Sequence, residues 1–225
     1  MALAPRLIDV AVPADAAAAV LVLHGGASRG DRMMVSPAQL SVLRMIPIAR
    51  RIARVDRRRL AVFRLLNSRR GWDADRTPVR DVHWALDQVA ERFGRRLPTC
   101  LVGHSLGGRG ALLAAPRPEV RGVVALAPYV YATDAPTGLN GQRLLIVHGT
   151  RDRIADPARS AALAQELASR TAVGYVSVEG AKHAMLRRHG VFSGLAADFA
   201  AATLLGSNPS GLIARLESGE RWIRV

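Results

Sequence analysis

The chain has 225 residues, of which 49% are apolar, enough for one large core and too many for a small scaffold stapled by disulfides or a metal. Arg and Lys outnumber Asp and Glu by 32 to 18, and the net charge of +14 rests almost wholly on arginine, because Lys182 is the only lysine. The single cysteine, Cys100, excludes an internal disulfide and a CxxC metal or redox site.

Neither a membrane span nor a secretory signal is predicted. A spanning helix needs about 20 consecutive apolar residues, and the apolar stretch 16–23 is too short and runs into His24-Gly25-Gly26 instead of a cleavage site. We therefore expect a cytoplasmic protein without a membrane partner. Aromatic residues make up only 4% of the chain, so the stacking platforms of nucleic-acid binders are missing and no specific nucleic-acid partner is expected.

Short runs rich in Val, Ile and Leu alternate along the chain with longer segments of helical spacing. The apolar runs span 20–23, 60–66, 100–102, 123–127, 144–147 and 173–178. The helical segments span 37–54, 77–93, 106–115, 157–169 and 193–205. Ser36, Thr77 and Asp156 each precede a proline, which predicts a capping side chain before an N1 proline. The alternation predicts an α/β fold: a mostly parallel central sheet with helices on both faces.

One domain is expected over 1–206, because no linker or internal repeat interrupts it. The breaker-rich segment 206–211 then leads into a tail, 207–225, that carries apolar residues such as Ile213, Trp222 and Ile223. The tail is too short to bury these groups by itself. We expect it to pack either on the domain or on a second subunit, and the oligomeric state stays open between monomer and homodimer.

A G-x-S-x-G pattern follows the third of these predicted strands. Residues 103–108 read Gly-His-Ser-Leu-Gly-Gly and precede a helical segment, which is the strand-turn-helix context that exposes a serine nucleophile. Ser105 is therefore the candidate nucleophile, and the Leu106 amide stands at a helix N-terminus beside it.

A serine nucleophile needs a base, and the base needs a carboxylate to orient it. Asp152 follows the strand 144–147 and His183 follows the strand 173–178, so both lie in loops at the same edge of a parallel sheet as Ser105. Asp156 and Asp134 are the rival acids, although Asp156 precedes a proline as a helix cap would. His189 is the rival base.

These segments resemble the α/β-hydrolase superfamily, in particular its small, lid-poor members that are similar to dienelactone hydrolases and short esterases. The resemblance covers about 20–205, and it implies Ser105, Asp152 and His183 as the catalytic triad. In the family, a turn after the third strand completes the oxyanion hole, and residues 24–28 occupy that place here. The resemblance thus implies amides of Leu106 and of either Gly26 or Ala27.

The resemblance implies hydrolysis of a small carboxylic ester through an acyl-enzyme, with no metal and no organic cofactor. Only 12 residues, 132–143, separate two predicted elements where many members insert a lid, so we expect a minimal lid or none. A thioester, lactone or amide substrate is open as well, because acyl transfer uses the same apparatus. A ligand-binding protein without catalysis is the alternative of a different class.

The sequence offers only a few candidate residues for contacts with the substrate. Trp72 lies where the family has a loop beside the substrate pocket, although packing at the sheet edge explains it equally well. Arginines near the expected site, Arg29, Arg109 and Arg151, are candidates to bind a carboxylate if the substrate is anionic.

Overall fold

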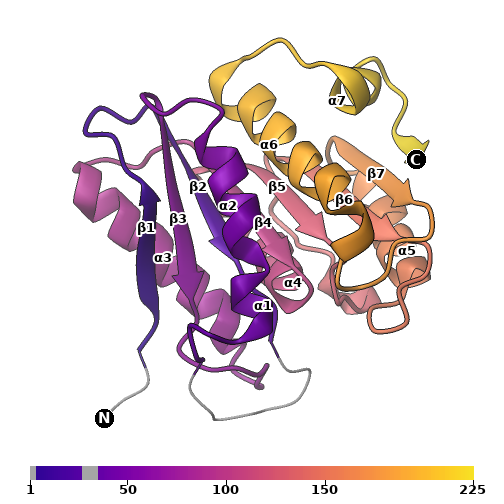
Figure 1. Cartoon of the computed structure of the whole chain (residues 1–225), viewed down its shortest axis with the longest axis horizontal. Coiled ribbons are helices and arrows are strands. Elements are labelled where there is room, and N and C mark those ends of the chain that lie inside the picture. The colour runs from indigo at the N-terminus through magenta and orange to yellow at the C-terminus, as the bar shows by residue number, and fades with distance from the viewer. Residues whose placement is uncertain (1–3, 27–34) are drawn as a thin grey trace.

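The computed structural model describes residues 4–26 and 35–225, and within them eight strands form one sheet with helices on both faces (Figure 1). The order across the sheet is β1-β3-β2-β4-β5-β6-β7-β8. Only the β1–β3 pairing is antiparallel among these neighbours. The strands are β1 (Arg6–Ala11), β2 (Ala18–Leu23), β3 (Leu60–Leu66), β4 (Thr99–His104), β5 (Val120–Leu126), β6 (Arg143–Gly149), β7 (Val173–Val178) and β8 (Trp222–Arg224). The mostly parallel α/β prediction is confirmed.

Two helical layers cover the sheet. The helices are α1 (Leu40–Leu43), α2 (Met45–Ala53), α3 (Thr77–Phe93), α4 (Leu106–Leu113), α5 (Pro157–Ala168), α6 (His189–Leu205) and α7 (Gly211–Glu217). Residues of α2 and α6 share one core cluster, whereas residues of α3, α4 and α5 share the other. Successive strand residues supply the two layers in turn: Val20 and Val22 face the first, and Leu21 and Leu23 the second. No helix of the described residues has the length and apolarity to cross a membrane.

Several predicted boundaries differ from the structure. The segment 37–54 forms two helices, and α6 begins at His189 instead of 193. The Asp156 carboxylate caps α5 as predicted, accepting a hydrogen bond from the Ala158 amide at 2.9 Å. Thr77 is instead the first residue of α3, and its amide donates to the Asp73 carboxylate at 2.8 Å. The Ser36 hydroxyl accepts from the Ala38 amide four residues before α1 begins, so it orders a turn and not a helix start.

The tail at 207–225 folds back on the sheet. Gly206, in the left-handed region at φ 64°, ends α6, and the chain then forms α7 and the edge strand β8, which pairs in parallel with β7. Ile213 and Ile223 are 1% and 3% exposed and belong to the core cluster of α2 and α6. The tail therefore covers the β7 edge of the sheet and part of α6.

The strand order reverses between β2 and β4, because the chain runs outward from β2 to β3 and then returns to the other side of β2. Loops diverge at such a point and leave a crevice beyond the carboxyl ends of the two strands. The segments that follow are 24–26 after β2 and Ser105 after β4. The topology thus positions the G-x-S-x-G turn beside the predicted oxyanion loop.

Glycines make the turn from β4 into α4 possible. A Cβ on Gly103 would lie 2.1 Å from the Gly107 carbonyl oxygen, and a Cβ on Gly107 would lie 2.5 Å from that of His24 and 2.6 Å from that of Leu23. These neighbours are backbone atoms, so they cannot rotate aside as the end of a side chain could. The contact therefore holds the start of α4 directly against the end of β2.

We predict that Gly107→Ala lowers the free energy of unfolding by about 3 kcal/mol or more, because the new methyl group overlaps two backbone carbonyls. Gly110→Ala is the matched control in the same helix, since the nearest atom to its Cβ, from Val82, is 4.0 Å away. The control is expected to gain about 0.5–1 kcal/mol from helix propensity. Urea denaturation of both variants checks this, and equal stabilities would contradict it.

For the tail, we predict that Ile223→Ala lowers the free energy of unfolding by about 2–4 kcal/mol through loss of buried methyl groups. Arg224→Ala in the same strand is the control: its side chain is 74% exposed and pairs only with Glu179 at the surface. Its cost is expected to stay below about 1 kcal/mol. Chemical denaturation of the two variants is the measurement, and a neutral Ile223→Ala would show that β8 does not belong to the cooperative core.

Candidate active site

Ser105 occupies a strained backbone position at the junction of β4 and α4. Its φ of 56° and ψ of −119° lie in a region that residues with a side chain rarely adopt. Its amide donates to the Leu126 carbonyl at 3.0 Å, and its carbonyl accepts from the amides of Arg109 and Tyr129 at 3.1 Å each. Backbone hydrogen bonds from three segments therefore hold the strained turn in place.

The structure brings Ser105, His183 and Asp152 into one hydrogen-bonded chain. The His183 Nε2 atom lies 3.0 Å from the Ser105 Oγ, and the His183 Nδ1 atom lies 2.7 Å from the Asp152 Oδ2. A carboxylate only accepts, so Nδ1 carries the proton toward Asp152 and Nε2 is left to accept the serine proton. The three side chains arrive from the loops after β4, β6 and β7.

The Asp152 carboxylate is held in its ionised form. Burial would raise its pKa, but hydrogen bonds from His148 and His183 and from the amides of Ile154 and Ala155 outweigh burial and hold the pKa well below the ordinary range. The two amides donate to Oδ1 at 2.8 and 3.0 Å, while both histidines bond Oδ2. Asp152 is therefore a fixed negative charge beneath His183.

His148 is a contributor that the sequence analysis did not select. Its Nε2 lies 3.2 Å from the Asp152 Oδ2 and 3.1 Å from the Ala155 carbonyl, and both partners are acceptors, so this nitrogen is protonated. Its Nδ1 lies 2.7 Å from the Ser160 hydroxyl, which contacts Tyr175 in turn. A series of hydrogen-bonded, buried side chains thus extends from Asp152 through His148 and Ser160 to Tyr175. The spacing of these residues in the sequence does not show that they are in contact.

Two other histidines beside the site are buried in neutral form. Burial, followed by the charge of His183, lowers the pKa of His104 to about 3, and its Nε2 donates to the His183 carbonyl at 2.9 Å. Burial is also the main cause that lowers the pKa of His24, whose Nε2 accepts from the Asn67 amide at 3.1 Å. His104 and His24 therefore fix the loops of the site without competing for the serine proton.

The rival residues lie elsewhere. Asp134 is paired with Arg109, and Asp156 caps α5. His189 is the first residue of α6. Only His183 is placed between a buried carboxylate and the Ser105 hydroxyl.

Of the predicted oxyanion residues, Leu106 and Gly26 lie in the described part of the chain. Leu106 is the first residue of α4, where an amide has no acceptor within the helix. Gly26 packs tightly against the β3–α3 loop, since a Cβ there would lie 2.0 Å from the Arg70 carbonyl oxygen, and it faces the same pocket as Leu106. Ala27, the alternative to Gly26, and Arg29 lie outside the described residues.

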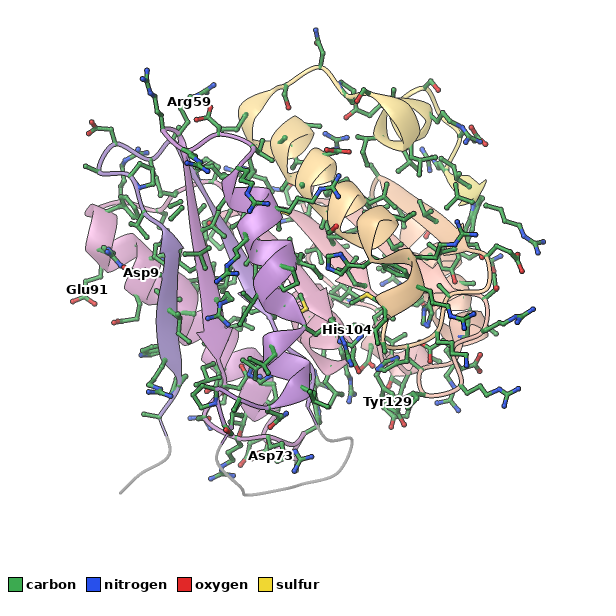
Figure 2. The ribbon with its side chains drawn as sticks, in the orientation of Figure 1. Asp9, Arg59, Asp73, Glu91, His104 and Tyr129 are labelled. Atoms are coloured by element: carbon green, nitrogen blue, oxygen red, sulfur yellow. The ribbon has the colours of Figure 1, made fainter. Side chains whose placement is uncertain are left out.

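A pocket of about 260 Å³ opens at Ser105. The loop after β2, the serine turn and His183 line it. Ser41, Arg44, Tyr129 and Ile154 line it as well. Figure 2 shows two of the lining residues, His104 and Tyr129, near the carboxyl edge of the sheet. Over the part of the chain that is described, no group of three or more His, Cys, Asp or Glu side chains is arranged for a metal ion.

Arg109 is engaged in an ion pair beside the site. Its Nη2 donates to the Asp134 Oδ1 at 2.8 Å, and its Nε lies 2.8 Å from Oδ2. Its guanidinium carbon also lies 4.0 Å from the Trp72 ring centre and 4.8 Å from that of Tyr131. Neither Trp72 nor Arg109 lines the Ser105 pocket, and Arg151 is exposed outside it. Trp72 and Arg109 thus form a packed cluster and Arg151 is a surface residue, and contact of the three with a substrate stays a prediction.

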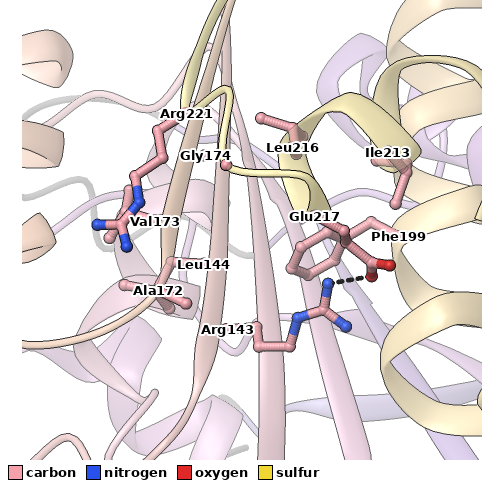
Figure 3. A pocket seen from close by; sticks show the side chains of 11 residues that line it. Arg143, Leu144, Ala172, Val173, Gly174, Phe199, Ile213, Leu216, Glu217 and Arg221 are labelled. Atoms are coloured by element: carbon pink, nitrogen blue, oxygen red, sulfur yellow. Dashed lines mark hydrogen bonds and ion pairs between the residues drawn. The ribbon is translucent and has the colours of Figure 1, made fainter.

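A larger cavity, about 500 Å³, lies far from this chemistry (Figure 3). It opens where β6 and β7 begin, against α6 and α7, whereas Ser105 follows the carboxyl end of β4. An ion pair between Arg143 and Glu217 crosses it, beside the ring of Phe199. Its volume exceeds that of the Ser105 pocket, but it contains no triad residue, so we assign the candidate active site to the smaller pocket.

We predict that Arg109→Met lowers the free energy of unfolding by about 3–5 kcal/mol, because it leaves the Asp134 carboxylate, 2% exposed, without its counter-charge. Adding Asp134→Asn removes that charge and should restore part of the loss. Denaturant titrations of the single and double variants measure both effects. A loss below about 1 kcal/mol for Arg109→Met would show that the pair is not structural and would return Arg109 to the list of substrate contacts.

No protein-family model and no curated protein matches this sequence. Solved structures do match. One is an α/β serine hydrolase homologue from Coxiella burnetii, with a TM-score of 0.62 and 17% identity over 86% of this chain and 89% of that one. Another is an α/β serine hydrolase without lid from Xanthomonas campestris, with a TM-score of 0.64 and 18% identity over 91% of this chain and 90% of that one. The esterase domain of a Rhodothermus marinus protein also matches, with a TM-score of 0.58 and 18% identity over 88% of this chain and 90% of that one. In this chain the β5–β6 connection holds one short 3-10 turn, Ala132–Asp134, where a lid would be inserted. The chain therefore has the α/β-hydrolase fold in a form without a lid.

Proposed function

We propose that the protein is a serine hydrolase that cleaves small carboxylic esters through an acyl-enzyme. The observation that carries the proposal is the hydrogen-bonded chain from Ser105 through His183 to Asp152, with 3.0 and 2.7 Å between the bonded atoms. Hydrolase and esterase structures among the matches support it. The assignment of a triad and of oxyanion donors is part of the proposal.

In the first half-reaction, the Ser105 Oγ attacks the ester carbonyl while the His183 Nε2 takes the hydroxyl proton. Asp152 keeps the imidazole in the required tautomer and stabilises its cation. The amides of Leu106 and Gly26 are proposed to donate to the oxyanion, a contribution of roughly 3 kcal/mol for one donor. His183 then gives its proton to the departing alcohol oxygen, and the acyl group stays on Ser105.

In the second half-reaction, His183 takes a proton from water, and the resulting hydroxide attacks the acyl carbon. The tetrahedral intermediate collapses, the Ser105 oxygen regains the proton and the carboxylic acid departs. The volume of about 260 Å³ equals roughly nine water molecules at about 30 Å³ each. A pocket of this size suits a small acyl group.

Two alternatives share the fold. A thioester, lactone or amide hydrolase would use the same residues and differ only in the substrate. A ligand-binding protein without catalysis would keep the pocket and dispense with the triad, and the ordered contact between Ser105 and His183 favours catalysis over this reading.

The decisive experiment is labelling of the full chain with a fluorophosphonate, which forms a phosphorus–oxygen bond to an activated serine and releases fluoride. We predict that wild-type protein is labelled at Ser105, as mass spectrometry would show, and that Ser105→Ala is not. A panel of 4-nitrophenyl esters graded by acyl length should show highest kcat/KM for the short acyl groups. Asp152→Asn should reduce kcat by about 10⁴-fold because it stabilises the wrong imidazole tautomer. A folded wild-type protein that neither labels nor hydrolyses any ester would disprove the proposal.

A further inference from the structure

Among the described residues that line the Ser105 pocket, one side chain is permanently charged, and it is a cation. Among the described lining residues, Arg44 carries a guanidinium, and no Asp or Glu faces the pocket. Asp152 does not compensate it, since its side chain is fully buried beneath His183. The pocket is therefore electropositive on the side formed by α1 and α2.

Arg44 lacks a counter-charge among the described residues, as the exposed Arg50 of α2 also does, but Arg44 is partly buried and lines the Ser105 pocket. Arg109 pairs with Asp134 and Arg69 with Asp73, whereas none of the described carboxylates lies within ion-pair distance of Arg44. Burial lowers the pKa of Arg44, and no acidic neighbour offsets that effect. A partly desolvated charge without a partner is costly to the folded protein. Such a cost is tolerated where a ligand supplies the missing anion.

The position of Arg44 explains why it faces the pocket. It stands at the junction of α1 and α2, and the next residue, Met45, is 1% exposed in the core, so the helical spacing turns Arg44 away from that core. Its charge also acts on His104, which directly precedes the nucleophile: after burial and His183, Arg44 is a further cause of that residue's low pKa. Ser41, one helical turn earlier, lines the pocket too, and its hydroxyl accepts from the Gln39 side chain at 2.6 Å. The Ser41 proton is thereby left free to be donated.

We propose that Arg44, assisted by the Ser41 hydroxyl, binds a carboxylate of the substrate, so that the natural substrate is a small ester that carries a free carboxylate group. This inference rests on the proposed function of the same site. The planar guanidinium donates two parallel hydrogen bonds to a carboxylate, which fixes both the position and the orientation of the ester relative to Ser105. The specificity residue is thus an arginine that sequence reasoning, which named Arg29, Arg109 and Arg151, did not select.

The test compares two esters of the same shape and different charge: monomethyl glutarate, which is anionic, and methyl 5-methylhexanoate, in which an isopropyl group replaces the carboxylate. Titration of the released acid gives kcat/KM. For the wild-type chain we expect at least a 10-fold preference for the anionic ester. Arg44→Gln should lower kcat/KM by 10-fold or more for the anionic ester and by less than twofold for the neutral one. Arg44→Lys should retain part of the preference.

Arg50→Gln is the matched control, because Arg50 is an exposed residue of α2 outside the pocket and its substitution removes the same charge. It should leave both esters within twofold, and thermal unfolding should show each variant to be folded. Equal losses for both esters in Arg44→Gln would mean that Arg44 only supports the structure. Unchanged discrimination would mean that it does not contact the substrate. Either result overturns the inference.

A binding measurement separates this inference from the proposed function. Ser105→Ala cannot turn over an ester, yet calorimetry should show that it binds glutarate, with affinity lost by at least 10-fold when Arg44→Gln is added. Glutarate binding without any Ser105 labelling or ester hydrolysis would disprove the hydrolase and keep the anion site. Ester hydrolysis with glutarate binding that is absent or independent of Arg44 would keep the hydrolase and overturn the anion site.

Discussion

The close approach of two backbones at Gly107 is the contact on which the rest of the site depends. At that point the first turn of α4 touches the carbonyl groups at the end of β2, and any larger residue would push them apart. The contact brings Ser105 beside the loop after β2 and leaves the serine in a backbone region that is otherwise unfavourable. Ser105, the proposed nucleophile, is thus held in a strained position by backbone contacts alone. Backbone hydrogen bonds then join Ser105 to Leu126 of β5 and to Tyr129 in the segment after it.

Around this turn, the buried histidines differ from His183 in the hydrogen bonds that they make. His24, His104 and His148 are buried, and each donates to a carbonyl or carboxylate oxygen that fixes its tautomer. His183 alone joins the Asp152 carboxylate to the Ser105 hydroxyl. His24 and His104, whose pKa values burial lowers, hold the loops, and the ionised carboxylate beneath His183 is the counter-charge that a protonated imidazole requires. This division lets four histidines lie close to one serine without repelling the proton that the proposed reaction transfers.

The sequence predicted the parts of this molecule that depend on local patterns. Unbroken apolar runs located β3 and β7 to the residue, and the glycine spacing located the serine turn. The edge strand β1 was missed because Arg6 and Asp9 interrupt its apolar residues and none of its residues is fully buried. Contacts between distant segments were also beyond local reasoning. Nothing in the order of residues shows that Arg109 is committed to Asp134, or that a helix junction turns Arg44 toward Ser105. Arginine is so frequent in this chain that its spacing has no diagnostic value, and only pairing in space separates a structural arginine from an unpaired one.

The short strand β8 also has a consequence for the order in which the protein folds. Its neighbour Val225 accepts a hydrogen bond from the Glu179 amide at 2.6 Å, and Arg224 pairs with the Glu179 side chain, so the tail fastens the beginning of the loop that carries His183. Ser105 is synthesised more than one hundred residues before this fastening segment. During synthesis, the serine turn can therefore form against β2 while the loop of its partner histidine is still unanchored. Contacts between segments so far apart in sequence form slowly, so the contact between His183 and Ser105 is expected to form after the serine turn itself.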